Sequence, residues 1–152
     1  MADIKSPEAR SKNMSAIRSV NTRPEVKIRK ALFAKGYRYR LHDKKLPGKP
    51  DIVLPKYKTV IFIHGCFWHG HEGCYLYKRP AQNREFWDQK ISANKKRDAE
   101  VTKALLEKKW KVLIVWECSI KGRYKLPFDD VISKIIAFIH SDKAYDEIRS
   151  SE

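Results

Sequence analysis

The sequence lacks the marks of a membrane or secreted protein. Its 152 residues contain no stretch near the roughly 18 to 20 consecutive apolar residues of a membrane-spanning helix. Residues 1–7 lack the apolar core of a signal peptide. The three cysteines are too few, and odd in number, for a disulfide framework. We therefore expect a cytosolic protein whose cysteines are reduced and available as metal ligands.

Internal repeats, low-complexity tracts and long linkers are also absent. With 42% hydrophobic and 11% aromatic residues, the chain has enough apolar material for one core. We expect a single domain over residues 1–152.

Acidic residues are scarce relative to basic ones. Thirty-three Lys and Arg face 18 Asp and Glu, which gives a net charge of +15. The excess is larger in residues 1–76, with 16 basic and 6 acidic side chains, than in residues 77–152, with 17 and 12. This balance favours a polyanionic partner such as nucleic acid. The alternative is a basic surface that serves only solubility.

Helix signals occur in four places. Ser6 and Pro7 predict the start of a short basic helix to about Ile17, within an N-terminal arm of residues 1–20. Capping residues, apolar spacing and a following glycine predict the others, at residues 22–36, 84–108 and along a stripe from Val131 to Ile139.

Four segments have the composition of strands. Residues 37–42 alternate aromatic or apolar with mostly basic side chains, which predicts a half-buried strand. Residues 51–54 and 59–64 suit an antiparallel hairpin, and 111–117, with its apolar centre, is predicted to be a fully buried strand. The helix at 84–108 can cross over between 59–64 and 111–117, so these two should be parallel. The fold class is therefore α/β, a mixed central sheet flanked by helices on both sides.

Metal-ligand side chains follow the central strand. Cys66 and Cys74 lie in the loop after it, and Cys118 follows the strand that we expect to be parallel, so all three should meet at one sheet edge. Three thiolates and one imidazole form a closed tetrahedral set that binds structural zinc. His71 is the favoured imidazole because it leaves His69 unused, but the spacing permits either.

A second group of polar residues points to catalysis. Asp51 opens a strand beside the central one and can hold a hard divalent ion such as magnesium. Glu25 shares the inward face of its helix, while His64 ends the central strand and His69 lies in the loop above. These groups can converge as a metal-binding acid with proton acceptors. The alternatives are a turn at Asp51 and an ion pair at Glu25.

Two adjacent aromatics, Phe67 and Trp68, lie within the ligand-rich loop. Large apolar side chains at an exposed loop suggest contact with another molecule, although core packing is the alternative there and at Trp87.

At these positions the sequence resembles the very short patch repair DNA mismatch endonucleases. The resemblance runs in order over about residues 10–140, and Cys-Phe-Trp-His is its most specific piece. The motifs that carry it are Ser11 to Ile17, Leu46 to Asp51, Val60 to Cys74, Glu85 to Trp87, and Val112 to Cys118. The family belongs to the restriction-endonuclease-like superfamily, which agrees with the mixed sheet.

The resemblance implies a magnesium-dependent nick on the 5′ side of the thymine in a T:G mismatch. Asp51 and the backbone carbonyl of Ile63 would bind Mg²⁺, His69 would be the general base, and His64 and Glu25 would support them. The substrate would be double-stranded DNA in the bacterial cytoplasm, at the nucleoid. We expect a monomer, with mismatch-repair proteins as candidate partners.

The resemblance also implies further sites. Structural Zn²⁺ would be bound by Cys66, His71, Cys74 and Cys118. The positions that match DNA-contacting residues of the family are Phe67, Trp68, Trp87, Met14, Lys90 and Asn94. Two positions depart from the family pattern: Ile63 stands where threonine is common, and Gly73 lengthens the histidine-to-cysteine spacing by one residue.

Two rival functions fit the same residues. One is a related nuclease with relaxed mismatch or lesion specificity. The other is a zinc-stabilised DNA-binding module without catalysis, in which Asp51 and His69 would have no task.

Overall fold

The computed structural model describes residues 22–78 and 80–151. The helix expected from Ser6, with Met14, lies outside them. The elements, in chain order, are α2 (Arg23–Ala34), β1 (Arg40–Leu41), β2 (Ile52–Leu54), η1 (Pro55–Tyr57), β3 (Thr59–His64), α3 (Arg84–Glu107), β4 (Lys111–Trp116), η2 (Glu117–Ser119), α4 (Phe128–Ile139) and β5 (Tyr145–Ile148).

The described strands form a five-stranded mixed sheet in the order β1-β2-β3-β4-β5. The pairs β1-β2 and β2-β3 are antiparallel, whereas β3-β4 and β4-β5 are parallel. This confirms the predicted hairpin and the central position of β3. Because His64 pairs with Trp116 in the register, β3 and β4 end at the same edge. The loops after both strands therefore meet there.

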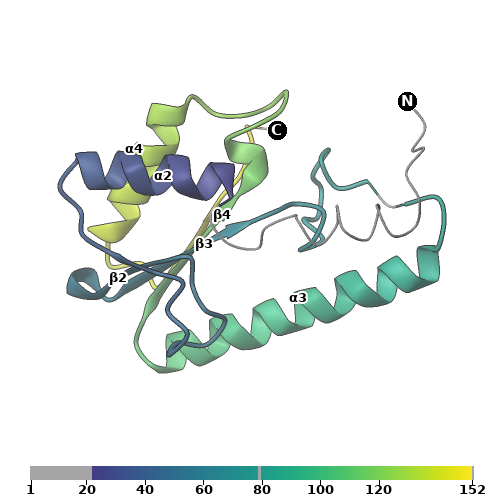
Figure 1. Cartoon of the computed structure of the whole chain (residues 1–152), viewed down its shortest axis with the longest axis horizontal. Coiled ribbons are helices and arrows are strands. Elements are labelled where there is room, and N and C mark those ends of the chain that lie inside the picture. Colours follow the sequence, from purple (N-terminus) through teal and green to yellow (C-terminus); the bar gives the residue numbers. More distant parts are fainter. Residues whose placement is uncertain (1–21, 79, 152) are drawn as a thin grey trace.

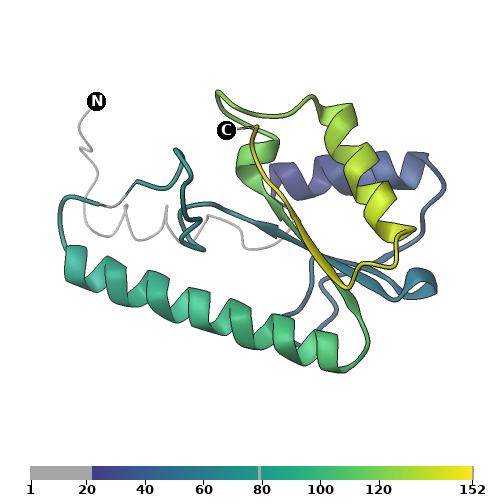
Figure 2. The ribbon, with the colours of Figure 1, turned by 180° about the vertical axis from the view of Figure 1, so that it is seen from behind.

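Helices cover both faces of the sheet, as predicted. Helices α2 and α4 lie on one face and the long α3 on the other (Figures 1 and 2). Ile28 of α2 and Ile135 of α4 share a core with β2 and β3, while Leu105 of α3 packs with Val60 and Val112 on the opposite face. The N-terminal half of α3 extends past the sheet toward the loop that follows β3 (Figure 1). The loop that follows β3 is thus supported by the edge of the sheet and by α3.

The strand predicted at 37–42 was largely wrong. Only Arg40 and Leu41 pair with β2, and both are exposed. The tyrosines before them instead contact helices, because the Tyr39 hydroxyl donates to the Arg29 carbonyl of α2 at 2.9 Å. His42 then leaves the extended conformation with φ 49°. A positive φ in a non-glycine residue ends the regular strand.

Strand β5 had not been predicted. Its only buried residue is Ile148, so it lacks an apolar run, and β4 supplies its backbone partners. The Trp116 indole N–H also donates to Glu147 Oε1 at 2.6 Å.

The limits of α2 and α3 agree with the sequence to within about two residues, whereas α4 begins at Phe128, three residues before the predicted stripe. Thr22 caps α2 by accepting the Glu25 N–H at 3.4 Å, and Gly36 follows its end with φ 96°. Among residues 22–78 and 80–151, no helix is both long and apolar enough to cross a bilayer.

Candidate active site and metal centres

The loop after β3 brings together a sulfur-rich cluster. One potential ligand atom from each of Cys66, His71, Cys74 and Cys118 lies within 4.8 Å of the others, and all four residues are buried. Three thiols and one imidazole match the donor set of structural zinc. A hydrogen bond from Cys66 lowers the pKa of the Cys118 thiol to about 5 and raises that of Cys66. One thiolate is therefore already favoured within the group, as a cation site requires.

Neighbouring residues hold His71, the histidine of the sulfur cluster, in place. The ring of His71 stacks on Trp116 at 3.8 Å between centroids and 2° between planes. Its Nδ1 lies 3.6 Å from Cys118 Sγ, which also accepts the Ser150 N–H at 3.3 Å. Trp116 of β4 thus holds His71, and the segment after β5 holds Cys118.

The additional residue in this loop is accommodated locally. Gly73 has φ 66°, a conformation that glycine adopts readily. Its carbonyl accepts an N–H of Arg149 at 3.1 Å, and the Glu72 carbonyl accepts another at 3.3 Å. The longer histidine-to-cysteine spacing therefore still lets His71 and Cys74 reach one cluster.

His69 belongs to a different group. Its Nδ1 lies 2.6 Å from Asp98 Oδ2 of α3, and its ring stacks on His64 at 3.8 Å and 2°. Burial, with the charge of His69 adding to it, lowers the pKa of His64 to about 3, so this ring stays neutral near pH 7. The structure therefore separates His69, held by a carboxylate, from His71, held among the thiols.

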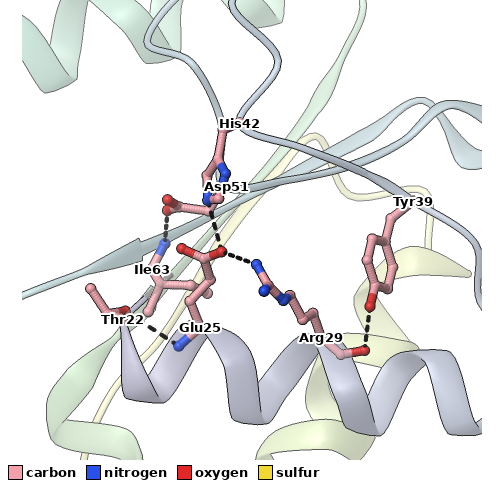
Figure 3. A network of polar contacts seen from close by, with 7 residues as sticks. All are labelled: Thr22, Glu25, Arg29, Tyr39, His42, Asp51 and Ile63. Atoms are coloured by element: carbon pink, nitrogen blue, oxygen red, sulfur yellow. Dashed lines mark hydrogen bonds and ion pairs between the residues drawn. The ribbon is translucent and has the colours of Figure 1, made fainter. Parts of the chain in front are cut away.

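Asp51 and Glu25 lie together at the start of β2 (Figure 3). Asp51 Oδ2 accepts the Ile63 N–H at 2.7 Å. Burial, together with the nearby charge of Glu25, raises the pKa of Asp51 to about 7. Glu25, with 1% of its surface exposed, accepts from Arg29 at 2.8 Å and contacts His42 Nε2 at 2.7 Å. A buried and a partly buried carboxylate at one place provide the hard oxygen ligands that a divalent cation prefers.

The aromatic residues of the loop meet the beginning of α3. Centroid distances are 5.2 Å for Phe67 to Trp68, 5.4 Å for Phe67 to Trp87 and 5.7 Å for Trp68 to Trp87, all near edge-to-face. All three side chains are half-buried, whereas Phe86 beside them is 59% exposed. Core packing therefore does not enclose them, and one aromatic surface remains open to solvent.

The other two positions matched to DNA contacts lie further along α3. The Asn94 side-chain amide donates to the Trp68 carbonyl at 2.9 Å, so it also holds the aromatic loop. Lys90 is exposed one turn before it.

Sequence reasoning missed two residues of these groups, His42 and Asp98. Asp98 lies seven residues after Ile91 and seven before Leu105 in the helix predicted at 84–108, so a carboxylate in line with apolar positions was the available signal. His42 was assigned to a regular strand, and no sequence pattern indicated the positive φ that turns the backbone there.

Comparisons with known proteins agree on one family. The profile of the family described as DNA mismatch endonuclease Vsr matches residues 2–76. The chain is 43% identical over 148 residues to the DNA mismatch endonuclease Vsr of Escherichia coli K12, covering 97% of this chain and 94% of that protein. It is 48% identical to the type II nicking enzyme V.XorIIP of Xanthomonas oryzae, covering 79% and 88% of the two chains. Against V.NmeAIP of Neisseria meningitidis, also named a type II nicking enzyme, the identity is 50%, with coverage of 81% and 87%.

Proposed function

The chain belongs to the Vsr family of DNA mismatch endonucleases, and from this premise we propose that it nicks DNA on the 5′ side of the thymine in a T:G mismatch. Such mismatches arise when 5-methylcytosine is deaminated, and the nick would start very short patch repair. The observation that carries the proposal is one loop, residues 65–74, which holds His69 beside Asp98 and also carries two half-buried aromatics. The chain acts as one restriction-endonuclease-like domain and as a monomer, with mismatch-repair proteins as further partners.

Asp51 and the backbone carbonyl of Ile63 are the proposed ligands of Mg²⁺, with Glu25 in support. When bound, the ion supplies positive charge that offsets the charge of the reacting phosphate. His69 takes a proton from the attacking water at Nε2, because Asp98 occupies its Nδ1. The neutral ring of His64, stacked on His69, fixes the orientation of the base without repelling its positive charge.

Zinc is proposed as the structural metal, bound by Cys66, His71, Cys74 and Cys118. The four residues form a closed set of three thiolates and one imidazole, which is typical of a structural site. The ion would therefore hold the loop that carries His69. The metal would take no part in cleavage.

The aromatic surface is the proposed detector of the mismatch. Phe67, Trp68 and Trp87 enter the base stack beside the mismatch, where weak stacking makes insertion less costly than in a matched duplex. Lys90 and Asn94 read the mismatched pair, and Met14, outside the described residues, approaches from the minor groove. The net charge of +15 holds the phosphates.

Nicking should be at least about 100-fold faster on a T:G duplex than on the same duplex with C:G, since the difference in unstacking cost is a few kcal/mol. The measurement is single-turnover cleavage of end-labelled duplexes in Mg²⁺. A T:A duplex of the same sequence controls for the thymine itself. Equal rates on all three would exclude mismatch specificity and leave a nuclease of relaxed specificity.

Asp98→Asn should reduce nicking about 100-fold, because a neutral partner stabilises protonated His69 less and permits the wrong tautomer. Single-turnover rates measured over a range of pH would show the loss. Glu100→Gln, on the exposed side of the same helix, is the matched control and should leave the rate unchanged. A wild-type rate and pH profile in Asp98→Asn would remove this carboxylate from the mechanism.

A further inference from the structure

We infer that Glu25, His42 and Asp51 together form a divalent-cation site whose imidazole ligand makes it bind Mn²⁺ more tightly than Mg²⁺. The inference rests on the proposed function in one respect, since Asp51 is shared with the proposed magnesium site. Direct ligation by Glu25 and by His42 goes beyond that function, in which Glu25 only supports the ligands.

The three side chains converge from separate segments. Glu25 belongs to α2, His42 follows β1 and Asp51 precedes β2, and Figure 3 shows their polar ends directed toward one another. One potential ligand atom from each lies within 4.8 Å of the other two. His42 Nε2 is 2.7 Å from Glu25 Oε2. A small rearrangement would allow all three atoms to bind one ion at the usual distances of about 2.0 to 2.3 Å.

The backbone at His42 favours a specific role for this side chain. Its φ of 49° lies in the left-handed region, which few non-glycine residues adopt. The His42 N–H still donates to the Asp51 carbonyl at 3.2 Å, so the turn is anchored to the residue that shares the site. Strained residues persist where the surroundings fix them, often at ligand sites. Here the turn places the imidazole beside two carboxylates.

The charges of the site call for a cation. Glu25 is buried and Asp51 is partly buried, and the charge of Glu25 disfavours the negative charge of Asp51. Arg29 contacts one of them, Glu25, at 2.8 Å. A divalent ion between the two carboxylates would offset the remaining repulsion, and the imidazole of His42 offers it a nitrogen ligand.

The donor set decides which ion fits better. Mg²⁺ strongly prefers oxygen ligands in octahedral geometry, whereas Mn²⁺ lies in the transition series and accepts imidazole nitrogen more readily. Two carboxylates and one imidazole therefore favour Mn²⁺. In the competing explanation, His42 is only a hydrogen-bond partner of Glu25 and does not discriminate between the ions.

The test is binding of Mn²⁺ to the full-length, zinc-containing protein, followed by electron paramagnetic resonance. Pulsed spectra of the wild type should show coupling of Mn²⁺ to imidazole nitrogen. His42→Asn should remove that coupling and reduce the ratio of Mn²⁺ to Mg²⁺ affinity about tenfold, because asparagine tolerates the left-handed backbone but offers oxygen. His140→Gln is the matched control: His140 is exposed and its ring bonds Tyr37 at 2.7 Å. Its spectra and affinities should equal those of the wild type.

Two results would overturn the inference: Mn²⁺ bound without the nitrogen coupling, or an unchanged affinity ratio in His42→Asn. Melting temperatures of both variants show whether they are folded. The nitrogen coupling in the wild-type spectrum tests the inference without relying on any variant. Nicking of the T:G duplex in Mg²⁺ without nitrogen coupling would refute this inference alone. Nitrogen coupling without nicking in either metal would refute the proposed function alone.

Discussion

Asp51→Asn should reduce nicking of a T:G duplex at least about 1,000-fold, corresponding to roughly 4 kcal/mol of lost transition-state stabilisation. The side chain is nearly isosteric, and its amide oxygen can still accept the Ile63 N–H that Asp51 accepts at 2.7 Å. The charge that would hold a divalent ion is lost. The effect should therefore fall on metal-dependent chemistry and leave the fold intact.

The same substitution should raise the melting temperature when no divalent ion is added. Burial raises the pKa of Asp51 to about 7, above the value of about 3.9 in an unfolded chain. The unfolded state then loses its proton at lower pH than the folded state, so the ionised carboxylate destabilises the fold increasingly between these values and fully above pH 7. A neutral asparagine avoids that cost.

Single-turnover cleavage with enzyme in excess measures the first effect, and thermal unfolding in chelator measures the second. Asp129→Asn is a suitable control because Asp129 is exposed in the first turn of α4. If Asp51→Asn keeps more than a tenth of the wild-type rate in Mg²⁺, Asp51 is not the essential metal ligand.

Much of the fold could be predicted because its central strands are apolar on both faces. Residues 59–64 and 111–117 could only be buried, and the helix between them gave the parallel crossover. The edges were harder. β1 pairs through two exposed residues, and β5 is held by β4 and by an indole bond to Glu147. Such strands depend on tertiary partners rather than on their own composition.

The candidate site could likewise be predicted only in part from the sequence. Convergence of Cys66 with Cys118 followed from the parallel register of the strands before them, and the structure confirms it. His42 and Asp98 could not be assigned, because one depends on a local backbone turn and the other on the approach of α3 to the loop. The choice between His69 and His71 also required the fold, since both fit the spacing.

The geometry of those two histidines leads to a sharp prediction about zinc. His71→Ala should lose the roughly one zinc per chain that we expect in the wild type, whereas His69→Ala should retain it. A closed zinc site contributes directly to folding, so loss of one ligand should lower the melting temperature by about 10 °C, at roughly 2 to 4 °C per kcal/mol for this chain length. His69, beside Asp98 and with no thiol contact of its own among the described bonds, should affect cleavage without that destabilisation.

Metal analysis of the purified variants, with thermal unfolding, separates the two roles. Zinc at the wild-type level in His71→Ala, or its loss in His69→Ala, would contradict the assignment. Chelating zinc from the wild type should also abolish nicking even in excess Mg²⁺, and restored zinc should recover it. The reason is that the cluster ties the loop that carries His69 to the edge of the sheet, because Cys66 follows β3 and Cys118 follows β4. Without the cluster, the Asp98 contact alone would have to orient the base.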